Sequence, residues 1–110
     1  MSAYRIVALP GDGTGREVMT EALKVLDVFQ KNGDVEFEIR VIPCGGQHYL
    51  ETGEQWPEGS FEICRDESDA ILLGAIGWPD ARLPNGDVAG GEVILGLRSG
   101  LDLYANVRPV

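Results

Sequence analysis

The sequence is poor in basic and in metal-ligating side chains, and these shortages exclude several classes of function. Nine Lys and Arg residues face 18 Asp and Glu residues, which gives a formal net charge of −9 and an isoelectric point near 4.4. Nucleic acids and anionic membranes both require clustered positive charge, so we expect neither as a partner. There is one histidine, His48, and no apolar run approaches the roughly 20 residues of a membrane span. The sequence therefore predicts no metal site of its own and no membrane-spanning helix.

Cysteine is almost as scarce, since the chain has only Cys44 and Cys64. Two thiols are too few for the disulfide framework of a small secreted domain, so we expect reduced core thiols and a cytoplasmic protein. No Ser-His-Asp or Cys-His arrangement can be argued, because the single histidine has no such partners at a suitable spacing. We therefore assign no catalytic acid, base or nucleophile to this chain.

Glycine, by contrast, is abundant at 15 of 110 residues, about twice its average share. Three glycines fall in the turn at residues 11–15, between an apolar run at 5–10 and an amphipathic segment at 16–31. This order predicts a buried strand, a glycine-rich turn and a helix. Successive amides at the start of a helix can bind an anion, but a tight turn that merely needs glycine explains the pattern as well.

Strand and helix signals continue to alternate further along the chain. Strict alternation at residues 35–41 predicts a strand with one solvent-exposed face near a sheet edge. Residues 43–57 have no regular pattern, and residues 58–67 predict a short helix. The apolar run at 70–76 predicts a strand buried on both faces.

The last third of the chain predicts a long loop at residues 77–91, a helix at 91–100 and a final strand at 101–110. Strands that alternate with helices predict an α/β fold, with a mostly parallel sheet flanked by helices on both faces. Ligands bind at the carboxyl ends of such strands, where we expect the turn at 11–15, the long loop and Arg108. A domain rarely finishes on an apolar strand, so we expect the polypeptide to continue.

Two arginines are candidates for binding a carboxylate. Arg98 ends the expected last helix, and Arg108 lies ten residues later in the expected final strand; the chain has only seven Arg and two Lys in all. Arginine binds planar carboxylates in bidentate fashion, so two arginines at the ligand-binding edge would suit a dicarboxylate. Surface arginines paired with some of the 18 acidic residues are the alternative.

The stretch LPGDGTGREV at residues 9–18 resembles the opening of the β-decarboxylating dehydrogenases, the isocitrate/isopropylmalate dehydrogenase family. Thr14 and Arg16 stand where that family usually has Ile and Pro. The resemblance continues along the whole chain in the right order and keeps the spacing of the two arginines. It is carried by Gly45-Gly46, Thr52-Gly53-Glu54, the run LLGAIG at 72–77, Leu97-Arg98 and the run LYANVRP at 103–109.

The resemblance implies an enzyme that oxidises a 2-hydroxy dicarboxylic acid with NAD or NADP and Mg²⁺ or Mn²⁺, and then releases the β-carboxylate as CO₂. Residues 1–110 would form the N-terminal segment of its large, cofactor-side domain, inactive alone. The metal ligands and proton-transferring residues would lie outside this chain, and the full-length protein would be a homodimer. Arg98 and Arg108 would bind the substrate carboxylates. The residues implied on the cofactor side are Thr14, Gly77, Trp78 and Glu92.

The residues just before the first arginine indicate the substrate. Isocitrate enzymes carry Ser and Asn six and four positions before it, where this chain has Glu92 and Ile94. A carboxylate at Glu92 would repel a third substrate carboxylate, whereas Ile94 and Leu95 would form an apolar wall for an isopropyl group. The resemblance thus favours 3-isopropylmalate, the substrate in leucine biosynthesis. Tartrate, D-malate or isocitrate dehydrogenase, or a non-catalytic carboxylate-binding or regulatory subunit, remains an alternative.

Overall fold

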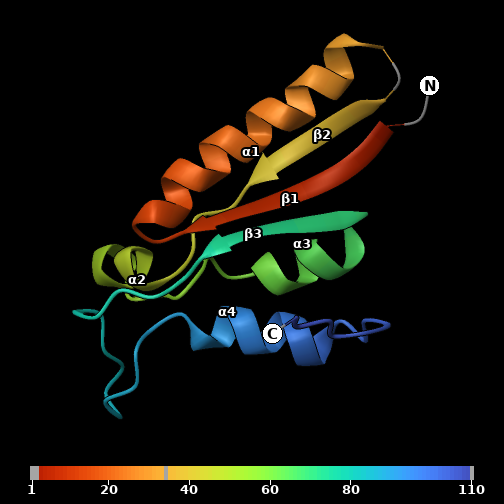
Figure 1. The fold of residues 1–110 in the computed structure, drawn as a ribbon. Helices are drawn as coiled ribbons and strands as arrows, with labels where there is room; N and C mark the ends of the chain where they lie inside the picture. The colour runs from red at the N-terminus through yellow and green to blue at the C-terminus, as the bar shows by residue number, and fades with distance from the viewer. Residues whose placement is uncertain (1–2, 34, 110) are drawn as a thin grey trace.

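The computed structural model describes residues 3–33 and 35–109, and it confirms the α/β fold class (Figure 1). Strand β2 (Glu36–Val41), strand β1 (Ala3–Gly11) and strand β3 (Ala70–Ala75) form one parallel sheet in the order β2-β1-β3. Helix α1 covers one side of the sheet, and helices α3 and α4 lie on the other. The helices are α1 (Thr14–Lys31), α2 (Gly46–Thr52), α3 (Ser60–Asp66) and α4 (Gly91–Gly100).

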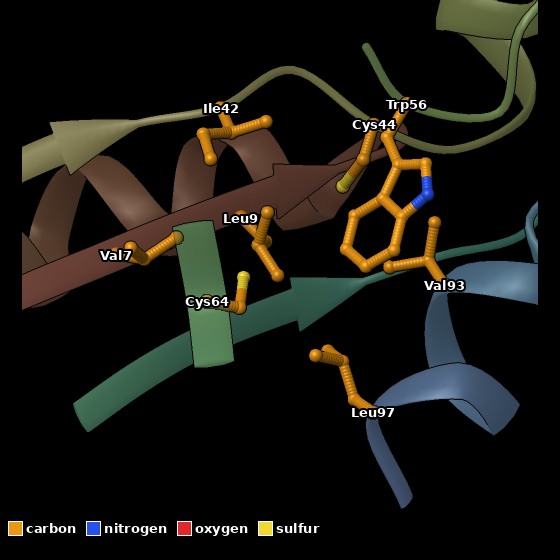
Figure 2. Packing of buried hydrophobic residues seen from close by; sticks show 8 residues of the cluster. All are labelled: Val7, Leu9, Ile42, Cys44, Trp56, Cys64, Val93 and Leu97. Atoms are coloured by element: carbon orange, nitrogen blue, oxygen red, sulfur yellow. The ribbon is translucent and has the colours of Figure 1, made fainter. Parts of the chain in front are cut away.

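Strand β1 is the centre of the structure because it pairs with both other strands. Its residues Val7, Ala8 and Leu9 are buried, and alternate side chains point to opposite sides of the sheet. Val7 and Leu9 belong to the main core on the side of α3 and α4, as Figure 2 shows. The other members of this cluster are Ile42, Cys44, Trp56, Cys64, Val93 and Leu97.

Helix α1 forms where the amphipathic pattern predicts it, although it begins two residues earlier. Glu17 lies in its first turn and Lys31 in its last, which suits the helix dipole. The helix ends at Lys31 with Asn32 as its C-cap, and Gly33 follows with a positive φ of 83°, the left-handed conformation expected after a helix. In the part of the chain that the structure describes, no helix is long and apolar enough to cross a membrane.

The structure corrects three expectations about the elements. Strand β3 is an edge strand, and most of its residues are partly or largely exposed, so it is not buried on both faces. The stretch at 43–57 contains the short helix α2 rather than only irregular structure. Residues 101–109 form no strand, because they follow α4 as an exposed tail with no neighbouring strand as a partner. The sheet therefore has three strands in the described residues, not the four expected.

Candidate functional site

The carboxyl ends of β1 and β3 are joined by the buried carboxylate of Asp12. Its Oδ2 accepts hydrogen bonds from the backbone N–H groups of Gly46, at 2.8 Å, and Gly77, at 2.9 Å. Its Oδ1 accepts a third from the N–H of Gln47, at 2.8 Å. The side chain is 3% exposed, although it carries a charge. Asp12 thus connects the glycine-rich turn to the start of α2 and to the segment after β3.

The same turn has little capacity to bind an external anion. The Asp12 N–H donates to the carbonyl of Ala75, and the Gly13 N–H donates to Oε1 of Gln47. The Gly15 and Arg16 N–H groups donate within the turn itself. Because these donors already have acceptors, the structure favours a tight turn that needs glycine over the anion site that the sequence left open.

Close packing explains the glycine at one position of this turn. A Cβ on Gly15 would lie 2.5 Å from the carbonyl oxygen of Pro10 and 2.6 Å from the backbone N of Ala75. Only glycine allows the start of α1 to approach β1 and β3 this closely. The turn is therefore held by steric fit as well as by the hydrogen bonds of Asp12.

Three of the residues proposed on the cofactor side lie together at this edge. Thr14 is exposed at the first position of α1, and Gly77 is exposed just after β3. Trp78 is half-buried, and a Cβ on Gly13 would lie 3.4 Å from its Cζ3 atom. The indole therefore packs against the turn that carries Thr14.

The fourth cofactor-side residue, Glu92, lies in the first turn of α4. Oε1 of Gln55 accepts hydrogen bonds from the backbone N–H groups of Gly90, at 2.8 Å, and Glu92, at 3.1 Å. The exposed Glu92 lines a cavity of about 400 Å³ that includes Gln55, Trp56 and Phe61. Neither Thr14 nor Trp78 lines this cavity, although Gly90, just before α4, packs against Ile76 and Gly45 at the same edge.

Ile94 and Arg98 lie one turn apart on α4 and line one cavity of about 440 Å³. Most of the other residues that line this cavity are apolar, and the charged residues Arg65 and Asp69 line it as well. The larger apolar residues are Ile71, Leu73, Leu97, Leu101 and Leu103. Leu95 does not line it and is 61% exposed. Ile94 and Leu95, the two residues predicted to form an apolar wall, therefore differ in position, and only Ile94 lies in this cavity.

The position of the two arginines differs from the expectation. The cavity of Arg98 includes Asp69 and Ala70, so Arg98 lies beside the amino end of β3 rather than at the carboxyl ends of the strands. Arg108 is exposed in the tail instead of ending a strand. The helix α4 runs back along the sheet, and this direction moves its last turn away from the carboxyl edge (Figure 1).

Neither arginine is used in an ion pair within the described part of the chain. Surface arginines paired with acidic residues were the alternative interpretation, and the structure gives Arg98 and Arg108 no such partner. Both guanidinium groups are therefore available to an anionic ligand.

The remaining titratable candidates are structural. Cys44 and Cys64 are free and buried, as expected of core thiols. Burial raises the pKa of the Cys44 thiol to about 11 and also raises the pKa of Cys64, so both stay protonated and unreactive near neutral pH. Nε2 of His48 is buried without a hydrogen-bond partner among the described residues. In residues 3–33 and 35–109, no three His, Cys, Asp or Glu side chains come together to hold a metal ion.

Sequence reasoning missed Asp12 and Gln55, which organise the edge. Asp12 is separated from its donors by 34, 35 and 65 residues, and Gln55 from its donors by 35 and 37. A local pattern carries no information on such distant contacts. The available signal was the acidic residue Asp12 between two glycines in the turn at residues 11–15.

Comparison with known proteins identifies relatives along nearly the whole chain. The family model described as isocitrate/isopropylmalate dehydrogenase matches residues 5–110. The 3-isopropylmalate dehydrogenase of Aquifex aeolicus is 46% identical over 110 residues, covering 99% of this chain and 30% of that protein. The 3-isopropylmalate dehydrogenase of Clostridium acetobutylicum is 41% identical over 109 residues, again covering 99% of this chain and 30% of the relative.

A solved structure agrees with these matches. The apo form of a beta-decarboxylating dehydrogenase from Thermococcus kodakarensis superimposes with a TM-score of 0.62 at 38% sequence identity. The match covers 92% of this chain and 27% of that protein. The chain thus spans about 30% of the length of the curated relatives that it matches.

Proposed function

This chain belongs to the isocitrate/isopropylmalate dehydrogenase family, and we propose on that basis that it forms part of a β-decarboxylating dehydrogenase. The enzyme oxidises the hydroxyl group of a 2-hydroxy dicarboxylic acid, passes the hydride to NAD or NADP, and releases the β-carboxylate as CO₂. The preferred substrate is 3-isopropylmalate, the acid named in the relatives described above.

We propose that residues 1–110 are the N-terminal segment of the large, cofactor-side domain. Residues outside this segment hold the Mg²⁺ or Mn²⁺ ion and transfer protons, so the segment alone has no activity. The complete protein is a homodimer in the cytoplasm, where two free, buried thiols are compatible with the reducing conditions.

The observation that carries the substrate proposal is that Ile94 and Arg98 lie one turn apart on the same side of α4. The guanidinium group of Arg98 has no ion-pair partner among the described residues, so it can bind a carboxylate in bidentate fashion. A dicarboxylate approaching a chain of net charge −9 needs such a local cation to overcome repulsion. Ile94 and the neighbouring leucines would receive the isopropyl group, at about 0.8 kcal/mol for each buried methylene.

Arg108 is the second proposed carboxylate ligand, and the exposed tail leaves its side chain free to reach a substrate. Thr14, Gly77 and Trp78 offer the dinucleotide an exposed edge with one aromatic surface. Glu92 at the start of α4 is the remaining cofactor-side candidate. Glu92 does not line the cavity of Arg98, so its carboxylate is not placed beside Arg98 to repel a third substrate carboxylate there.

The substrate proposal is tested by kcat/KM for four acids in the protein expressed from its complete reading frame: 3-isopropylmalate, D-malate, tartrate and isocitrate. We expect 3-isopropylmalate to give the highest value, and Ile94→Ser to lower it by about five- to twentyfold through loss of apolar contact. D-malate has no alkyl group and serves as the control, which should change little. An unchanged value for 3-isopropylmalate contradicts the role of Ile94. Binding of 3-isopropylmalate without any turnover favours the non-catalytic alternative.

A further inference from the structure

Asp12 is the only charged side chain that is buried among the described residues, and its carboxylate has three hydrogen-bond donors. All three are backbone N–H groups from segments distant in sequence, at Gly46, Gln47 and Gly77. An ionised carboxylate accepts hydrogen bonds and donates none, so one side chain satisfies all three groups at once. The hydrogen bonds of Asp12 therefore hold three separate segments together and do not serve only the turn at residues 11–15.

The position of Trp78 depends on these contacts. Gly77, the residue before it, is held by the hydrogen bond to Oδ2 of Asp12. A Cβ on Gly46 would lie 2.7 Å from the Cβ of Trp78, so the tryptophan packs directly against the segment that Asp12 also binds. On its other side the indole faces Gly13, whose N–H is held by Gln47. Gly13, Gly46 and Gly77, which lie against or next to Trp78, are therefore each connected to the carboxylate of Asp12, directly or through Gln47.

We propose that Asp12 is a positioning residue, which holds Gly77 and Trp78 in the conformation that binds the dinucleotide. The inference rests on the proposed function, since that function makes Gly77 and Trp78 cofactor contacts. Asp12 is covered by protein and acts only through the segment that it holds. Replacing its carboxylate by an amide keeps the shape of the side chain but removes the negative charge, which weakens every hydrogen bond that the side chain accepts. It also places an NH₂ group opposite either the N–H of Gln47 or those of Gly46 and Gly77.

The hydrogen bonds are tested by NMR in the protein of complete reading frame, comparing the wild type with Asp12→Asn. We expect the amide protons of Gly46, Gln47 and Gly77 to move upfield and the indole N–H resonance of Trp78 to shift. Asp27→Asn is the matched control, because it removes the same charge from the exposed face of α1, where Asp27 pairs with Lys31. Unchanged resonances at Gly77 and Trp78 in Asp12→Asn overturn the proposal.

Steady-state kinetics of the same variants tests the consequence for the cofactor. In Asp12→Asn we expect the KM for the dinucleotide to rise about tenfold or more, the effect of losing one charged hydrogen bond, while the KM for the hydroxy acid changes less than about twofold. A purely structural role would lower kcat, through a smaller active fraction, and leave both KM values unchanged. That result, or an equal rise in both KM values, overturns the proposal.

The two measurements separate this inference from the proposed function. Shifted resonances in a protein that oxidises none of the four acids overturn the proposed function, and with it the cofactor role of Asp12. Turnover with an unchanged dinucleotide KM overturns the role of Asp12 and leaves the proposed function in place.

Discussion

At the scale of single residues, the described structure separates charges used to hold the fold from charges available to a ligand. Asp12 is buried and fully engaged by backbone N–H groups. Arg98 lines a cavity without an ion-pair partner among the described residues. A buried charge that is fully hydrogen-bonded stabilises the fold, whereas a cation without an ion-pair partner can bind an anionic ligand.

Arg98→Ala is expected to raise the KM for 3-isopropylmalate about 10- to 150-fold, because a charged hydrogen bond contributes about 1.5–3 kcal/mol. Arg98→Lys should recover only part of the loss, since an ammonium group cannot bind a carboxylate in bidentate fashion. Arg40→Ala is the control, because Arg40 lies on the edge strand β2 and pairs with Glu67. Steady-state kinetics that show the same KM for Arg98→Ala and Arg40→Ala contradict the assignment.

The stability of the protein should fall between about pH 9 and pH 11 because of Cys44. Burial raises the pKa of this thiol to about 11 from an ordinary value near 9.0, so the folded state favours the neutral form. Its contribution is fully present below the unfolded pKa and is lost as the pH rises through the folded pKa. The free energy of unfolding, measured in urea from pH 8 to pH 11, should decline more steeply in the wild type than in Cys44→Ala. Parallel curves would show that the thiol does not titrate as described.

At the scale of elements, periodicity predicted those segments whose environment follows from their own sequence. The apolar run at 5–10, the amphipathic segment at 16–31 and the alternation at 35–41 became β1, α1 and β2 with small shifts of their ends. Each of these segments has a pattern of apolar residues that is typical of one secondary structure and indicates which side of it is buried. Their order along the chain was then enough to predict a parallel sheet between layers of helices.

The elements that sequence reasoning misjudged depend on distant partners. An apolar run such as 70–76 predicts a strand but does not say how many neighbours that strand has, and β3 proved to be an edge. Residues 101–109 have strand-like composition, yet a strand needs hydrogen-bonding partners, and the described sheet supplies none to this tail. The predicted location of Arg98 was wrong for a related reason, because the position of this residue depends on the direction in which α4 packs against the sheet.

The first turn of α4 is expected to depend on Gln55, which accepts hydrogen bonds from Gly90 and Glu92 across a separation of more than 30 residues. Gln55→Ala leaves these N–H groups without the side-chain acceptor and should cost about 1 kcal/mol. Hydrogen exchange should therefore become faster in α4 and stay unchanged in α1. Glu54→Ala, at the exposed neighbouring position, is the control. Equal protection of α4 in the two variants would contradict this capping role.

At the scale of the whole molecule, the chain exposes more surface than its size requires. Its accessible surface is 7153 Å², whereas a folded monomer of 11.9 kDa exposes about 5,950 Å². Large apolar side chains contribute to the excess, including Val18 and Val25 on α1 and Leu103, Tyr104 and Val107 in the tail. Surfaces of this kind are available to further polypeptide or to a second subunit, as the proposed enzyme requires.

The most direct measurement of the central claim is turnover of 3-isopropylmalate with a divalent metal and NAD or NADP, by residues 1–110 alone and by the protein of complete reading frame. We expect equal amounts of reduced dinucleotide and CO₂ from the complete protein, and neither product from residues 1–110. Metal-dependent turnover by residues 1–110, or no turnover of any of the four acids by the complete protein, would contradict it.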